Sequence, residues 1–167
     1  MHRNILFRSD RVPTLPASYI DTSNEEALWS WLDSLEKAGI RAMAIPHNSN
    51  ASKGKMFSPT KASGDPIDRK YAQARAHFER AIEIMQVKGN SEVHPDFWAA
   101  DEFANFENAN SIANYSGRKR AKENYVRHAI GQGLQHKQVL GANPYKLGFV
   151  GGSDSHNGTM GDLGSII

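Results

Sequence analysis

Residues 23–46 read SNEEALWSWLDSLEKAGIRAMAIP and predict one helix followed by one strand. Ser23 and Glu26 have the spacing of a capping box, which is typical of a helix start. The apolar side chains that then recur at helical spacing are Leu28, Trp31, Leu32 and Leu35. Gly39 stands where a left-handed C-terminal cap belongs, and the apolar residues 40–46 predict the strand.

The same alternation of strand and helix extends in both directions along the chain. We expect strands over residues 4–8, 81–87 and 146–150, helices over 66–80 and 118–140, and a short helix near 97–103. Such alternation predicts parallel strands joined by right-handed crossovers, and therefore an α/β sheet or part of a barrel with about four parallel strands. No internal repeat or change of composition divides residues 1–167, so we expect a single domain.

The composition is that of an ordinary globular domain. The chain has 167 residues, with 20 Lys and Arg against 18 Asp and Glu and a formal net charge of +2. So small a charge argues against nucleic acid or a membrane surface as the main partner. The absence of cysteine excludes a disulfide framework, a thiolate zinc site and a cysteine nucleophile. No signal peptide or membrane span is recognisable, so we expect a cytoplasmic location by default.

A cluster of basic residues stands at the start of the expected helix over 118–140. It consists of Arg118, Lys119, Arg120 and Lys122. A solvated helix face is the simpler interpretation, and contact with a phosphate group is the alternative. Binding of nucleic acid through this cluster would give an affinity that falls steeply with salt.

Polar side chains follow three of the expected strands. The second strand runs into His47, the fourth runs into Asp154 and His156, and the third leads from Glu83 to Glu92. Active sites of α/β proteins gather at the carboxyl ends of parallel strands, so His47, Asp154 and His156 are expected on one rim. An Asp-x-His pair on extended backbone places both side chains on the same side, about 7 Å apart.

These residue types indicate a metal site. Imidazole and carboxylate without thiolate suit zinc, manganese or iron in a hydrolytic centre, where a metal-bound water would be the nucleophile. Simpler interpretations stay open. His47 could form hydrogen bonds within a loop, residues 152–155 could form a turn, and Glu83 could face solvent from its strand.

Four motifs carry a resemblance to a known family. They read RNILFR at residues 3–8, IPHNSN at 45–50, VKGNSE at 87–92 and GSDSHNG at 152–158. In this order they resemble the domain-of-unknown-function 3604 family. The stretch LGFVGGSDSH, residues 147–156, is also similar to the last motif of the PHP-domain metal-dependent phosphoesterases. The segment around His47 resembles the histidine-proline motif of the same class.

The resemblance implies a distorted, TIM-like barrel that holds a cluster of divalent metal ions. The metal ligands would be His47, Asp154 and His156. The groups that would line the pocket as catalytic or substrate-contacting residues are Glu83 and Glu92. The side chains that would orient the ligands beside them are Asn48 and Asn157.

One departure from the PHP pattern bears on the completeness of the barrel. PHP proteins carry an amino-terminal His-x-His motif, and no His-x-His occurs in these 167 residues. We therefore expect the chain to be the carboxyl-terminal portion of a longer barrel. An incomplete barrel leaves strand edges exposed, which favours self-association or pairing with a missing amino-terminal half.

The resulting functional expectation is a metal-dependent hydrolase, with a small phosphoester or other anionic substrate. The loop over residues 49–64 carries Lys53 and Lys55, which would contact this substrate. The alternative is a non-catalytic module that keeps the fold and binds a metal or a protein partner. Metal content and turnover would separate the two.

Overall fold

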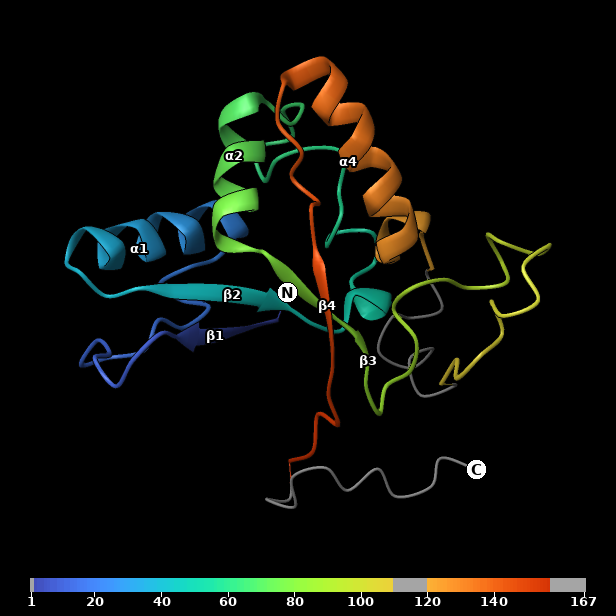
Figure 1. Ribbon diagram of the computed structural model, residues 1–167, viewed down its shortest axis with the longest axis horizontal. Helices are drawn as coiled ribbons and strands as arrows, with labels where there is room; N and C mark the ends of the chain where they lie inside the picture. Colours follow the sequence, from blue (N-terminus) through green and yellow to red (C-terminus); the bar gives the residue numbers. More distant parts are fainter. Residues whose placement is uncertain (1, 110–119, 157–167) are drawn as a thin grey trace.

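The computed structural model describes residues 2–109 and 120–156. The strands in this part are β1 (Arg3–Phe7), β2 (Ala42–Pro46), β3 (Ala81–Met85) and β4 (Gly148–Gly151). The helices are α1 (Glu25–Lys37), α2 (Arg69–Phe78) and α4 (Val126–Leu140), with short 3-10 helices at Ser49–Ala51 and Lys122–Asn124. Figure 1 shows α2 and α4 side by side above the strands, with α1 against β2.

The strands form two separate pairs and no barrel. β1 and β2 are antiparallel, with Arg3 opposite Pro46. β3 and β4 are parallel, with Ala81 opposite Gly148. The expectation of about four parallel strands in a TIM-like barrel is therefore wrong for the part of the chain that the structure describes.

The loop between β1 and α1 explains the antiparallel pair. In a right-handed crossover the helix runs back against the strand that precedes it. Here residues 8–24 return the chain across the molecule before α1 begins, so α1 runs in the same direction as β1 (Figure 1). β2 then runs back beneath α1 and meets β1 in the opposite direction. The order of strands and helices in the sequence therefore does not show whether two strands joined through a helix are parallel or antiparallel.

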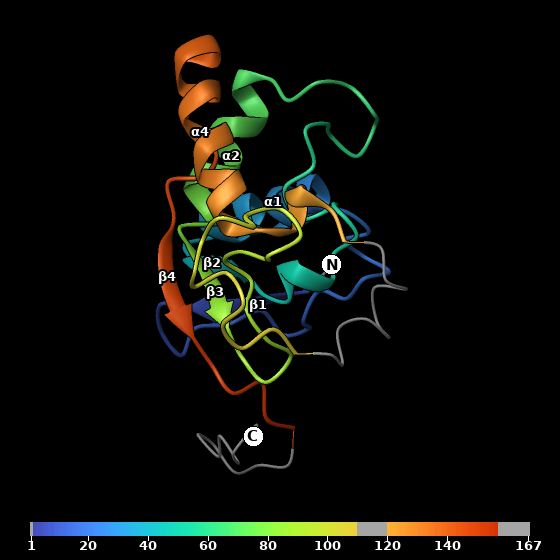
Figure 2. The same cartoon turned by 90° about the vertical axis from the view of Figure 1, so that its right-hand side faces the viewer.

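The carboxyl ends of three strands still reach a common region. β2 lies beside β3 without a hydrogen-bonded ladder between them, and β3 pairs with β4. Figures 1 and 2 show β3 and β4 running away from α2 and α4, whereas β2 runs across them and ends beside β3. Because β1 is antiparallel to β2, its first residue lies at this same end.

α1 begins one residue later than its capping box suggests. The N-cap is Asn24 instead of Ser23, and the Asn24 Oδ1 accepts a 2.9 Å hydrogen bond from the backbone N–H of Ala27. The helix buries Trp29, whereas Trp31 of the expected face is only partly buried. The buried apolar face consists of Leu28, Trp29, Leu32 and Leu35.

Two further expectations about helices need correction. The helix expected over 118–140 begins only at Val126, after the 3-10 helix Lys122–Asn124, and residues 118 and 119 lie outside the described residues. Residues 97–103 form turns instead of a helix. No helix in the described part of the chain has the length and apolar character that crossing a membrane requires.

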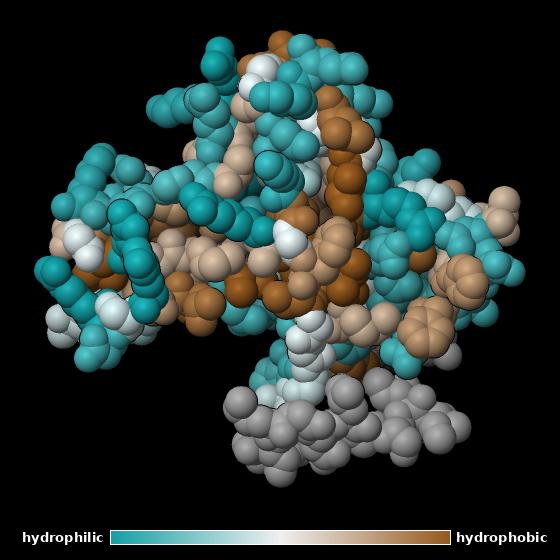
Figure 3. Space-filling view, in the orientation of Figure 1, coloured by the Kyte–Doolittle hydropathy of each residue, from teal (hydrophilic) through white to brown (hydrophobic). Residues whose placement is uncertain are grey.

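The core consists of two apolar clusters below the helices. The first lies between α1, β2 and α2 and includes Trp29, Leu32, Ala44, Tyr71, Ala72 and Phe78. The second joins α4, β3 and the loop after β2 through Met56, Phe57, Ile82, Val126, Ala129 and Tyr145. β4 adds little to either cluster because it is exposed along its whole length. Figure 3 shows apolar side chains at the surface over α4 and β4.

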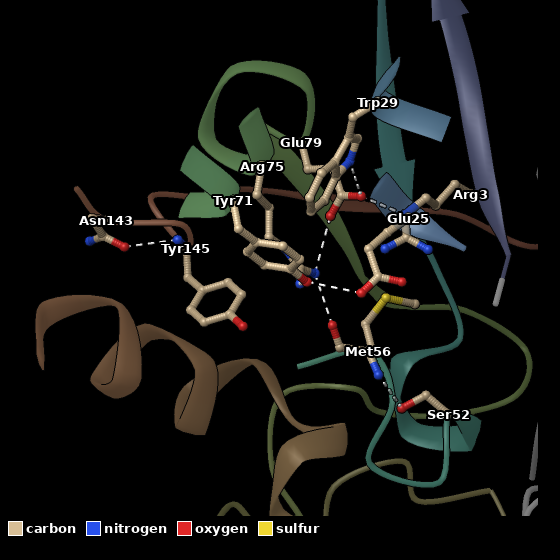
Figure 4. A network of polar contacts seen from close by, with 10 residues as sticks. All are labelled: Arg3, Glu25, Trp29, Ser52, Met56, Tyr71, Arg75, Glu79, Asn143 and Tyr145. Atoms are coloured by element: carbon tan, nitrogen blue, oxygen red, sulfur yellow. Dashed lines mark hydrogen bonds and ion pairs between the residues drawn. The ribbon is translucent and has the colours of Figure 1, made fainter. Parts of the chain in front are cut away.

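A buried ionic network ties β1, α1 and α2 together (Figure 4). Glu79 follows α2, and its Oε1 accepts hydrogen bonds from the Arg3 Nε at 2.5 Å and the Trp29 Nε1 at 3.0 Å. Its Oε2 lies 3.1 Å from the Arg75 Nη2. Burial raises the pKa of Glu79, but the charges of Arg3 and Arg75 outweigh burial and hold this pKa below its ordinary value.

Arg75 extends this network to the loop that follows β2. Its side chain is fully buried, and its Nη2 donates a 2.9 Å hydrogen bond to the carbonyl of Met56. The guanidinium carbon lies 4.8 Å from the ring centroid of Tyr145 and 5.5 Å from that of Phe57. One buried cation thus joins both apolar clusters and fixes the loop that carries Lys53 and Lys55.

Candidate functional site: a histidine and lysine cavity at the strand ends

A cavity of about 750 Å³ lies where β2, β3 and β4 end and β1 begins. The sequence-predicted residues that line it are His47, Asn48, Lys53, Lys55, Asp154 and His156. Residues that the sequence reasoning did not single out also line it, and they include His2, Met56 and Lys88. The strand-end argument therefore located His47, Asn48, Asp154 and His156 of this cavity, although its premise of four parallel strands was wrong.

The antiparallel register brings His2 to His47. Arg3 pairs with Pro46 in this antiparallel register, so His2, before Arg3, faces His47, after Pro46. The His47 N–H donates a hydrogen bond to the His2 carbonyl at 3.4 Å. The two ring centroids are 5.5 Å apart. A parallel β1 would have placed His2 at the opposite end of the sheet, which is why sequence reasoning missed it.

His47 is held as a neutral imidazole at neutral pH. Burial lowers its pKa, and the nearby positive groups of His2, Lys88 and His156 lower it further, to about 4. Its Nδ1 is buried and has no hydrogen-bond partner within the described residues. A neutral imidazole with an unpartnered nitrogen can accept a proton, a hydrogen bond or a metal ion.

Asp154 is held by polar side chains from the segment that follows β3. Its Oδ2 accepts a 3.1 Å hydrogen bond from the Gln86 Nε2 and is ion-paired with the Lys88 ammonium group. Gln86 also donates to the Asn48 Oδ1, so one amide joins the ends of β2, β3 and β4. The His156 ring lies against its own segment, with its Nδ1 2.6 Å from the Asp154 carbonyl.

Strained backbone gathers around this cavity. Asn48, Lys53 and Asp154 all have φ between 51° and 56°, in the left-handed region that non-glycine residues seldom adopt. Among the described residues, Glu107 is the remaining non-glycine residue with positive φ. Asn and Asp tolerate this conformation, whereas Lys53 makes no side-chain hydrogen bond to any described residue that would favour it. Strain of this kind concentrates at binding sites, where the surrounding structure holds it in place.

A buried amide network supports the loop that carries the lysines. The Asn124 side chain is fully buried; its Nδ2 donates to the Asn50 carbonyl and its Oδ1 accepts from the Ser52 Oγ, both at 3.0 Å. The Asn50 Nδ2 donates in turn to the carbonyl of Lys88 at 3.0 Å. The loop after β2 and the turn after β3 are thereby locked together. The sequence offers no signal for Asn124, because it is remote in the chain from both.

Glu83 lies beside the cavity instead of in its wall. It is on β3, its side chain is buried, and its Oε1 has no hydrogen-bond partner in the described part of the chain. Burial raises the pKa of this carboxyl, and Gln86 and Lys88 partly oppose that effect. A Cβ atom at Gly152 would lie 2.7 Å from the Glu83 Oε2, so the glycine leaves room for the carboxylate next to β4.

The remaining predicted residues are not brought to the cavity. The Glu92 Oε1 accepts a 2.6 Å hydrogen bond from the Arg127 Nη2 on α4. Asn157 lies outside the described residues. In the basic cluster, Arg120 pairs with Asp96 at 3.2 Å and the Lys122 ammonium lies 5.3 Å from the ring centroid of Trp98.

The donors around the cavity suit a divalent metal ion in their chemistry. Three imidazoles and one carboxylate are ligands for zinc, manganese or iron, and the unpartnered His47 Nδ1 is a free donor. Their positions do not form a complete metal site. Within residues 2–109 and 120–156, no three His, Asp or Glu side chains are grouped so that they could hold a metal ion. A metal at Asp154 would also have to replace Lys88.

Fold and cavity together define a small α/β protein with a polar, histidine-containing site at its strand ends. Comparison with family models gives a match over residues 1–164 to a family described as a protein of unknown function, DUF3604. The chain therefore belongs to this family. No curated protein and no solved structure matches it.

Proposed function

We propose that this chain forms the site of a PHP-like, metal-dependent hydrolase that acts on small anionic esters, most simply phosphoesters. The observation that supports the proposal most strongly is that His2, His47, His156 and Asp154 line the same cavity as three lysines. Metal-binding side chains and anion-binding side chains on one surface are what hydrolysis of a charged ester requires.

The lysines favour an anionic substrate. Lys53 and Lys55 come from the loop after β2, and Lys88 comes from the turn after β3. Lys88 is ion-paired with Asp154, whereas no ion pair is found for Lys53 or Lys55 among the described residues. Two free ammonium groups can hold the oxygens of a phosphate and offset its charge.

The proposed roles follow from these contacts. His47, His156 and Asp154, with His2 beside them, would hold the metal ion. A bound divalent ion would supply an activated water and polarise the ester. Gln86 holds Asp154 and Asn48 in position, and Glu83 lies buried next to Gly152, where burial raises the pKa of its carboxyl. The cavity volume of about 750 Å³ leaves space for a small ester.

A second candidate is a non-catalytic module that binds an anion. The Lys88–Asp154 ion pair favours it, because Asp154 is satisfied without a metal ion and the net charge of the cavity is positive. In that case phosphate binding would need no metal and no hydrolysis would follow.

Metal content and turnover of the purified chain test the proposal. We expect zinc, manganese or iron at one or more equivalents and metal-dependent hydrolysis of p-nitrophenyl phosphate. His47→Ala and Asp154→Ala should lose both properties, while His77→Ala, at an exposed pair with Glu36, should keep them. A chain that stays metal-free in metal-supplemented buffer and hydrolyses no ester would overturn the proposal. Phosphate binding without turnover would support the non-catalytic alternative.

A further inference from the structure

We infer that the substrate of this site carries a polyhydroxylated group, so that the natural ester is a phosphorylated carbohydrate or a similar polyol; this inference rests on the proposed function. A second cavity of about 580 Å³ adjoins the first, and His2 and Lys55 line both. Together they form one elongated site, with the metal-binding and lysine side chains at one end. The other end lies between β1, the loop before α1 and residues 58–62.

The wall of the second cavity offers both a hydrogen-bond donor and a hydrogen-bond acceptor. Arg3 lines it with a side chain that is 5% exposed, and its Nη2 is buried without a hydrogen-bond partner in the described residues. Glu25 lines the same wall and accepts a 2.9 Å hydrogen bond from the Tyr71 hydroxyl through one oxygen, Oε1. Both residues therefore face one cavity, and both side chains are drawn in Figure 4. Neighbouring hydroxyl groups both donate and accept, so a diol satisfies such a pair.

The charge of the second cavity argues against a second anion. Arg3 is ion-paired with Glu79, and Lys61 is paired with Asp68 at 2.9 Å. Glu25 adds a negative group to the wall. Lys55 lines both cavities, whereas Lys53 and Lys88 line only the first, so the charged end of the ester is expected in the first cavity and a neutral polar group in the second.

The rim of the second cavity fits a sugar ring. Its hydroxyl and amide side chains are those of Ser18, Thr22, Ser23, Asn24, Ser58 and Thr60. Tyr19 lies at the rim with 75% of its surface exposed, so its ring is free to pack against the C–H face of a sugar. An apolar aryl group would leave the Arg3 Nη2 without a hydrogen-bond partner.

Binding and hydrolysis of matched esters test the inference. Kd would be measured by calorimetry for glucose 6-phosphate, glucose 1-phosphate and inorganic phosphate, on the chain as purified and with manganese. We expect a sugar phosphate to bind about tenfold more tightly than inorganic phosphate. Tyr19→Ala should raise the Kd for the sugar phosphate about threefold to tenfold. Tyr19→Phe should bind the sugar phosphate as the wild type does, because the ring is kept. Ile20→Ala, at the exposed neighbouring position, is the control.

The outcomes separate this inference from the proposed function. Equal affinity for sugar phosphates and inorganic phosphate, or no binding of either, overturns the inference. A Tyr19→Ala variant that binds sugar phosphates as the wild type does also overturns it. If p-nitrophenyl phosphate is hydrolysed in these cases, the proposed function survives alone. If sugar phosphates bind preferentially and no ester is hydrolysed, the second cavity is supported as a binding site for a polyhydroxylated group and the hydrolase proposal fails.

Discussion

The ammonium group of Lys88 is ion-paired with the carboxylate of Asp154, the residue expected to bind a metal ion. Both side chains are largely buried, with 22% and 15% of their surfaces exposed. In this arrangement the lysine occupies the position that a cation would take. If the proposed function holds, binding of a metal ion and of an anionic substrate would be coupled, since a metal that displaces Lys88 from Asp154 would free an ammonium group for the substrate.

Replacing Lys88 should strengthen metal binding. In Lys88→Gln the carboxylate of Asp154 loses its competing cation, and we expect zinc to bind about tenfold more tightly, or about 1.4 kcal/mol. Isothermal titration of the chain with zinc measures this. Lys146→Gln, at an exposed position outside the cavity, should leave the affinity unchanged. A Lys88→Gln variant that binds zinc no better than the wild type would show that Asp154 is not a ligand.

Loss of the charge on Glu79 should destabilise the fold strongly. Glu79→Gln leaves two cations, Arg3 and Arg75, facing a neutral amide in a buried site. We expect the free energy of unfolding in urea to fall by about 3 kcal/mol or more. Glu36→Gln removes the carboxylate of the exposed pair with His77 and should change it by less than about 1 kcal/mol. Equal effects of the two substitutions would contradict the role given to the network.

The same network predicts a loss of stability in acid. The pKa of Glu79 is below its ordinary value of 4.5 in the folded state, so the unfolded chain binds more protons as the pH falls through 4.5. The stabilisation is complete above that pH and is lost progressively below it. Urea unfolding between pH 3 and pH 6 should show this slope. The slope should be shallower in Glu79→Gln, and an identical slope in both proteins would assign it to other groups such as Asp68 and Asp101, whose pKa values are also lowered.

The positions of individual helices and strands could be predicted from the sequence, whereas the relative directions of the paired strands could not. The apolar spacing of residues 28–35 located α1 because a helix is fixed by contacts within itself. The strand over 40–46 was likewise found, with its end at Pro46 confirmed. The antiparallel pairing of β1 depends on the path of residues 8–24, which have no periodic pattern. A barrel was therefore predicted where the described residues form two strand pairs.

The part of the candidate site that lies at the ends of strands could be predicted from the sequence. His47 and Asp154 were identified because each lies just beyond the end of an expected strand, and they do line one cavity. His2 was missed because its position depends on the register of β1 against β2. Glu92 follows the turn after β3 but bonds to Arg127 on α4, a long-range contact that no local pattern indicates.

The backbone of Lys53 gives a test of strain at the cavity. Its φ of 56° is unfavourable for any residue with a Cβ atom and is free of cost for glycine. We expect Lys53→Gly to be more stable than Lys53→Ala by about 1 kcal/mol in urea unfolding, although both variants lose the ammonium group and should bind phosphate equally weakly. The order should reverse at Lys37, in the last turn of α1, where alanine should be favoured over glycine by about 1 kcal/mol. If alanine is the more stable residue at position 53 as well, the left-handed conformation is not maintained in solution and the loop presents its lysines differently.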